Sequence, residues 1–188
     1  MKILKYKQRI IIVTSALFLT SLAVVCVAEE KCLKSAWEAF NKGKNAFYKE
    51  KEKHLTRTSF KEAISFATEC TDNFRKEADQ AQSKLDKSNV AEPPVGAVDD
   101  KDKDRIFKQG LLNDVATAYF VKGRAAEYLY QLGGTEAQSY KDMAQKAYAA
   151  TCRYKHARAW DPKDAKKPEG EGTFWSPCEA AKGRLPLD

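Results

Sequence analysis

The cysteines are the residues of this sequence whose type and spacing most directly suggest chemistry. The chain contains five, and four would remain after removal of an N-terminal leader: Cys32, Cys70, Cys152 and Cys178. An even set of thiols in an oxidising compartment predicts two disulfides. Three connectivities are possible, and we favour Cys32 with Cys70 and Cys152 with Cys178 because each pair would join neighbouring segments.

Metal binding and catalysis have little support from the sequence. There is no CxxC pair, and neither His54 nor His156 stands at a ligand-like spacing from a cysteine. Both histidines lie among charged residues, so we expect them to be exposed. A phosphate-binding glycine loop, HExxH and GxSxG are also absent from the sequence. A reactive thiol at Cys178, expected at a helix start, is the alternative. We predict no enzyme activity, no cofactor and no metal.

A second set of candidate residues is aromatic and lies near the C-terminus. Tyr154, Trp160, Phe174 and Trp175 flank a segment rich in Lys, Pro and Gly. One interpretation is that residues 161–188 fold back as a cap over the preceding helices, since large aromatic side chains are mostly packing residues. The alternative is a platform for a small ligand or glycan that uses Trp160 and Trp175.

The N-terminus has the layout of a secretory signal, a basic region followed by an uncharged run. The basic residues are Lys2, Lys5, Lys7 and Arg9. The uncharged run covers 19 residues, 10–28, and we place cleavage after Ala28. The alternatives are an uncleaved anchor, since about 20 apolar residues span a bilayer, and lipidation at Cys26. We expect the mature chain, 29–188, in the periplasm or outside the cell, with membrane contact only through an uncleaved or lipidated N-terminus.

The charge of the mature chain argues against nucleic-acid binding. The whole sequence has 33 basic and 26 acidic residues and a net charge of +7. Since the leader carries four basic residues and no acidic one, the mature chain has a net charge of +3. Its basic residues alternate with Asp and Glu instead of forming a patch, so we expect no nucleic-acid partner.

Helical periodicity dominates the sequence after the leader. Apolar residues recur every three or four positions from 32 to about 53 and again from 59 to about 85. Residues 87–104 contain adjacent prolines and a charge run, and we expect a loop there. The second periodic stretch opens with a capping box, which is Ser59-Phe60-Lys61-Glu62.

Two further helices and a short last one follow. The third stretch, 105–132, ends at a glycine pair, Gly133-Gly134, which permits a left-handed cap. A second capping box, from Thr135 to Gln138, starts a fourth helix that we expect to stop before Pro162. The sequence Ser176-Pro177-Cys178-Glu179 predicts a short helix to about Lys182. No segment alternates like a strand, so we predict an all-α fold.

Laid on each other, the two predicted helix pairs show small and large residues at matching places. In the first pair these are Phe40, Gly43, Lys44, Phe47, Phe60, Ala63, Ala67 and Cys70. In the second they are Tyr119, Lys122, Gly123, Ala126, Ala144, Tyr148 and Thr151. This pattern resembles the tetratricopeptide repeat (TPR), a family of antiparallel helix pairs. The units start 79 residues apart, and Lys44 stands where the family keeps glycine, so a different helical bundle is the alternative.

The resemblance implies an array of two TPR-like units in a single domain, 29–188, with 161–188 as its cap. A TPR grips an extended peptide or a partner's helix with the inner face of each first helix. Mapped onto this chain, that face consists of Asn41, Asn45, Tyr48, Phe120, Arg124, Glu127 and Tyr128. We therefore expect an exported scaffold or adaptor with a protein or peptide partner. A helical ligand-binding domain that uses Trp160 and Trp175 is the alternative.

Overall fold

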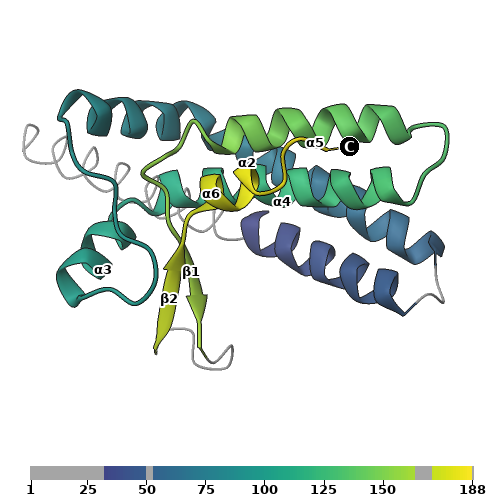
Figure 1. The fold of residues 1–188 in the computed structure, drawn as a ribbon, viewed down its shortest axis with the longest axis horizontal. Coiled ribbons are helices and arrows are strands. Elements are labelled where there is room, and N and C mark those ends of the chain that lie inside the picture. The colour runs from purple at the N-terminus through teal and green to yellow at the C-terminus, as the bar shows by residue number, and fades with distance from the viewer. Residues whose placement is uncertain (1–31, 50–52, 164–170, 188) are drawn as a thin grey trace, which may run out of the picture.

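A computed structural model of the chain describes residues 32–49, 53–163 and 171–187. The expected leader, 1–28, lies outside the described residues, and Cys26 lies outside them with it. Residues 32–48 are helical, and the other long helices are α2 (Lys53–Lys87), α4 (Gly110–Gln131) and α5 (Ala137–Thr151). Two shorter helices are α3 (Asp100–Phe107) and α6 (Pro177–Lys182). The prediction of a mainly helical fold is confirmed (Figure 1).

The long helices form two antiparallel hairpins. The helix over 32–48 runs against α2, where the ring centroids of Phe40 and Phe60 are 5.8 Å apart. α4 and α5 form the second hairpin, and Gly133 and Gly134 in their connection have φ angles of +70° and +97°, as predicted for a glycine helix end. α4 lies in the middle of the bundle and contacts α2, α5 and α6 (Figure 1).

One glycine in each hairpin allows its two helices to come close together. A Cβ atom at Gly43 would lie 2.9 Å from the ring of Phe60, and one at Gly123 would lie 2.6 Å from the ring of Tyr148. Both rings are fully buried. Because close-packed interiors leave no room for such overlaps, a larger side chain at either glycine would force the helices apart.

The two predicted capping boxes are wrong. α2 begins at Lys53 instead of Ser59, and the Ser59 hydroxyl is buried without a hydrogen-bond partner among the described residues. Ser59 lies inside the helix because Phe60 and Ala63 belong to the buried stripe that packs on the neighbouring helices. At α5, which begins at Ala137, no side chain caps the first turn.

The charge run that we expected in a loop begins a helix instead. The Asp99 carboxylate caps α3, because its Oδ1 accepts a hydrogen bond from the backbone N–H of Asp102 at 2.8 Å. Asp100 and Asp102 lie in the first turn, where negative charge interacts favourably with the helix dipole. The predicted third helix is thereby divided, since α3 ends at Phe107 and α4 starts at Gly110.

A β-hairpin follows α5, which ends earlier than predicted. β1 (Ala159–Pro162) pairs antiparallel with β2 (Gly172–Trp175). Gly96 extends this pairing, because its N–H and C=O bond to the backbone of Phe174 at 2.7 and 2.9 Å. The expectation of no strand was wrong, since strands of four residues contain too few positions for an alternating pattern to be recognised.

The last predicted helix, α6, is confirmed. The Ser176 hydroxyl accepts a hydrogen bond from the backbone N–H of Glu179 at 3.3 Å, and Pro177 occupies the first helical position. α6 packs on the second hairpin, where Ala181 is buried against Ala126 and its neighbours. The C-terminal segment therefore covers part of α4 and α5.

Candidate functional site: an aromatic cleft

The residues expected to form a peptide groove do not share one surface. Asn41 and Asn45 are exposed and line a depression that reaches Leu55 near the start of α2. Tyr48, at the end of the same helix, is 66% exposed. Phe120 lines a different cavity, together with Trp37 and Lys44 of the first helix.

The remaining three groove residues are held in the interior of the bundle. Tyr128 is 4% exposed and stacks on Phe60, with ring centroids 4.8 Å apart. The buried Glu127 carboxylate accepts hydrogen bonds from Arg124 at 3.1 Å and from the Tyr148 hydroxyl. Burial, together with the bond to Glu127, raises the pKa of Tyr148. The Tyr128 hydroxyl lies 3.2 Å from the Tyr48 hydroxyl and accepts from Arg124 at 3.3 Å. The structure thus brings Tyr48, Arg124, Glu127 and Tyr128 together, whereas the two asparagines and Phe120 line separate cavities.

A cleft of about 840 Å³ lies where the helix over 32–48, α4 and the β-hairpin meet. Six aromatic side chains line it: Trp37, Phe107, Phe120, Trp160, Phe174 and Trp175. They include all three tryptophans of the chain. The sequence indicated two of these as a platform but not Trp37 or Phe107. A signal was present in the first helix, because Leu33, Trp37 and Lys44 recur at helical spacing and all line the cleft.

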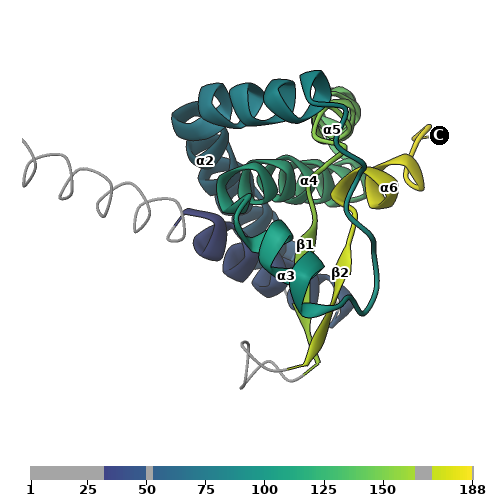
Figure 2. The same ribbon diagram turned by 90° about the vertical axis from the view of Figure 1, so that its left-hand side faces the viewer.

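One face of the hairpin forms an aromatic cluster with α3. Trp160 and Phe174 are paired across the strands with ring centroids 4.7 Å apart. Phe107 of α3 contacts them at 5.9 and 5.4 Å, and Figure 2 shows α3 beside the hairpin. The Lys103 ammonium lies 5.1 Å from the Trp160 centroid, within cation–π range. Gly172 lies under the Trp160 ring, where a Cβ atom would overlap the indole.

The other face of the hairpin is directed toward α4. Trp175 contacts Phe120 edge-on, with ring centroids 5.1 Å apart. Asp161 is paired opposite Thr173, and residues two apart on a strand share a face. Asp161 therefore lies on the same face of the hairpin as Trp175, next to the aromatic wall of the cleft.

Arg158 anchors the base of the hairpin. Its side chain is 5% exposed, and the guanidinium donates hydrogen bonds to the carbonyls of Pro94, Lys155 and Ala157 at 3.3, 2.9 and 2.7 Å. The Glu92 carboxylate lies 3.7 Å away. Burial lowers the pKa of Arg158, although arginine stays charged at neutral pH. The charge of Arg158 is thus satisfied within the protein.

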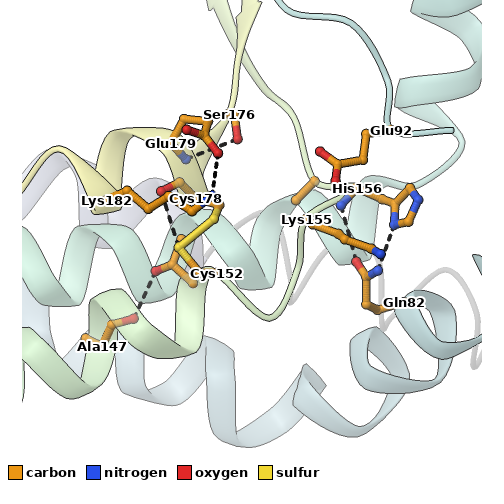
Figure 3. The surroundings of a disulfide bond; sticks show 12 residues. Gln82, Glu92, Ala147, Cys152, Lys155, His156, Ser176, Cys178, Glu179 and Lys182 are labelled. Atoms are coloured by element: carbon orange, nitrogen blue, oxygen red, sulfur yellow. Dashed lines mark hydrogen bonds and ion pairs between the residues drawn. A yellow bond between two sulfur atoms is a disulfide. The ribbon is translucent and has the colours of Figure 1, made fainter. Parts of the chain in front are cut away.

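His156 is buried, in contrast to our expectation, whereas His54 is exposed as predicted. The Nε2 atom of His156 lies 2.9 Å from the carbonyl oxygen of Val90. The Nδ1 atom of the same ring lies 2.7 Å from the side-chain nitrogen of Gln82 (Figure 3). Because a carbonyl can only accept, Nε2 carries the proton and Nδ1 accepts from Gln82. The ring therefore connects α2, the loop after it and the segment before β1.

The structure contains the two disulfides that the sequence favoured. Cys32 and Cys70 join the first helix to α2, with Cα atoms 5.6 Å apart. Cys152 and Cys178 join the end of α5 to α6, with Cα atoms 4.4 Å apart (Figure 3). The second disulfide closes a loop that contains the whole β-hairpin. It also removes the reactive thiol that we considered at Cys178, and such bonds are typical of an oxidising compartment.

Within the described residues, no group of three or more His, Cys, Asp or Glu side chains could hold a metal ion. Among the helices that the structure describes, none is both long and apolar enough to cross a membrane. Neither protein-family models, nor curated proteins, nor solved structures match the chain.

Proposed function

We propose that this chain is an exported helical binding module that holds an apolar segment of a polypeptide partner in the aromatic cleft. The proposal is carried by the gathering of six aromatic side chains, including every tryptophan of the chain, around one cavity. Five of the six keep part of their surface accessible, and only Phe174 is buried. Aromatic side chains, Trp above all, are enriched among the residues that dominate binding free energies.

The dimensions of the cleft suit an extended peptide. α4 lines it from Gly110 to Phe120, which corresponds to about 15 Å along a helix axis. An extended chain advances about 3.3 Å per residue, so about four or five residues would fit along this wall. Alternate side chains of such a segment would reach the aromatic walls, while its backbone would stay accessible to water.

A scaffold role of the TPR type is supported by the packing of the two hairpins. Gly43 approaches Phe60 and Gly123 approaches Tyr148, so each helix pair has a glycine at a tight contact between its two helices. We propose that the partner is nevertheless held by the cleft beside the hairpin instead of by the seven residues mapped from the family. The proposed location is the periplasm or the exterior, with a membrane-anchored form if the leader is retained.

The role that we propose is binding and not catalysis. The charged residues that line the cleft are Lys44, Asp114, Arg158 and Asp161. The Arg158 guanidinium is occupied by backbone carbonyls, and the rest of the wall is mostly aromatic or aliphatic. Such a surface can hold an apolar group but offers no nucleophile with a positioned base.

The proposed function can be tested with a variant in which a larger side chain fills part of the cleft. Gly110 lines the cleft, and a Cβ atom added there would meet no atom within 4 Å, so we expect Gly110→Leu to place its side chain in the cleft. Linear peptides selected from a displayed random library on the wild-type protein would be titrated by tryptophan fluorescence. We expect peptides with two or more apolar side chains, a shift in emission on binding, and at least about tenfold weaker binding to Gly110→Leu.

Gln80→Leu is the matched control, because it adds the same side chain on the exposed surface of α2. Its affinity for the selected peptides should equal that of the wild type. Selected peptides that bind Gly110→Leu as tightly as wild type, or a library that yields no binder, would contradict the proposal.

A small apolar ligand is the second candidate. The cleft volume of about 840 Å³ lies within the range of about 300–1,000 Å³ that is usual for small-molecule sites. An anilinonaphthalene dye that binds wild type but not Gly110→Leu, combined with failure of the peptide selection, would favour this candidate.

A further inference from the structure

Two charged side chains in the cleft have no partner in the described part of the protein. Lys44 is exposed on the first helix, and Asp161 is exposed on β1. Neither forms an ion pair or a side-chain hydrogen bond with any described residue, and both line the cleft. An unpaired charge beside an aromatic wall can select a ligand group of opposite sign.

The other two charged residues of the cleft are already engaged. Arg158 donates to three carbonyls and lies beside Glu92. Asp114 is half-buried and takes part in an interaction within the protein. Lys44 and Asp161 are therefore the two charges that a bound segment would meet first.

These two charges belong to different walls of the cleft. Lys44 follows Trp37 by seven residues, which places it on the same helix face about 10 Å further along the axis. Asp161 lies on the hairpin face that carries Trp175. The helical wall of the cleft therefore carries a cation on the same face as Trp37, and the hairpin wall carries an anion on the same face as Trp175.

We propose that the segment bound by the cleft has an apolar core flanked by one acidic and one basic side chain. The acidic group would pair with Lys44 and the basic group with Asp161. This inference rests on the proposed function and adds the charge pattern of the partner to it. The aromatic walls supply affinity, while the two charges set how the segment is placed along the cleft.

The test uses four blocked synthetic peptides that share the core Leu-Phe-Leu-Phe and differ only at their ends. The end pairs are Glu and Lys, Glu and Glu, Lys and Lys, and Gln and Gln. Affinities are measured by tryptophan fluorescence, because every tryptophan lines the cleft. We expect the mixed Glu and Lys peptide to bind the wild type roughly two- to fivefold more tightly than each of the others, as for exposed ion pairs.

Charge reversal provides the matched variants. Lys44→Glu should prefer the peptide with two Lys ends, and Asp161→Lys should prefer the peptide with two Glu ends. The double variant should again prefer the mixed peptide, now bound with its two ends exchanged, since both charges of the cleft are reversed. Because both side chains are exposed, the far-ultraviolet dichroism of all three variants should match that of the wild type. Raising the salt concentration should reduce these preferences.

The outcomes separate this inference from the proposed function. If all four peptides bind the wild type equally and all lose affinity for Gly110→Leu, the cleft binds apolar segments but does not read their charges, and the inference fails alone. If no peptide binds the wild type, the proposed function and the inference fail together. Preferences that ignore the charge reversals would also overturn the inference.

Discussion

The helical interior and the disulfide-closed loop 152–178 use aromatic side chains in different ways. In the interior, Phe60 and Tyr128 stack on each other and are 0% and 4% exposed. At the edge of the loop, Phe107 contacts Trp160 and Phe174 but is 49% exposed. The interior rings are enclosed by several long helices, whereas the rings at the cleft are covered from fewer sides. The same residue type therefore fills the core of one region and lines an open cleft in the other.

The two regions also differ in what holds them in place. Apolar helix faces and glycine contacts organise the interior. The hairpin instead depends on polar anchors and on a covalent bond at its base. Arg158 bonds to the loop before α3, and Asn113 of α4 accepts from the Arg158 backbone N–H at 2.9 Å. A disulfide between Cys152 and Cys178 closes the loop.

The largest expected effect compares two phenylalanines. Phe60→Ala should lower the free energy of unfolding by about 3–5 kcal/mol, because it leaves a cavity in a close-packed core. Phe107→Ala should lower it by only about 1 kcal/mol, since half of that ring is already in water, but should weaken peptide binding. Urea denaturation and fluorescence titration measure the two quantities. Equal losses of stability would break the comparison between interior and cleft.

The second prediction compares the two disulfides. Their loops are of similar length, with sequence separations of 38 and 26 residues, so replacing either pair by serine should cost about 3–4 kcal/mol of stability. Only the Cys152→Ser/Cys178→Ser variant should alter tryptophan emission and peptide affinity, because only that bond closes the loop with the hairpin. A Cys32→Ser/Cys70→Ser variant that remains folded but loses the same affinity would contradict this assignment.

The smallest expected effect is a change in melting temperature at Asp86, a residue of α2 that contacts the loop 152–178 through Lys155. Lys155, 3.1 Å away, and a hydrogen bond from Gln82 lower the pKa of this carboxyl below its ordinary value of 3.8. The ionised form therefore favours folding above that value, and the contribution is lost as the pH falls through the lower folded pKa. Asp86→Asn should reduce the melting temperature slightly at pH 6, and the difference from wild type should shrink toward pH 2.

The control for Asp86 is Glu62→Gln, which removes an exposed carboxylate on α2. Its melting temperature should follow that of the wild type across the same pH range. A difference between Asp86→Asn and wild type that grows on acidification would show that the sign of the effect is wrong.

Several parts of the fold could be predicted from residues close together in the chain. The end of α4 at Gly133 and Gly134 follows from the left-handed conformation that glycine permits. The start of α6 follows from Ser176 and Pro177, whose capping roles need only the next three residues. At Ser59 the predicted cap did not form, because its neighbours in α2 are buried against other helices, and this packing outweighed the local signal.

Other features depended on residues that are far apart in the chain. His156 lies among charged residues in the sequence, yet Gln82 and Val90 approach it from 74 and 66 residues away and bury it. Glu127 and Tyr128 matched a family's binding face but are covered by Tyr148 and Phe60. Side-chain periodicity cannot predict such burial, because it specifies which face of a helix is apolar but not which elements cover it.

The chain's own residues therefore specified the long helices, two of their boundaries, at Gly133-Gly134 and at Ser176, and the even set of cysteines, since periodicity, turn chemistry and cysteine number are properties of short stretches. Folding in three dimensions specified the aromatic cleft. Trp37, Trp160 and Trp175 come from two distant parts of the chain, and all line it because the hairpin is held next to the first helix and α4. The difference arises because hydrogen bonds in a turn involve neighbours in sequence, whereas burial and cavity shape involve neighbours in space.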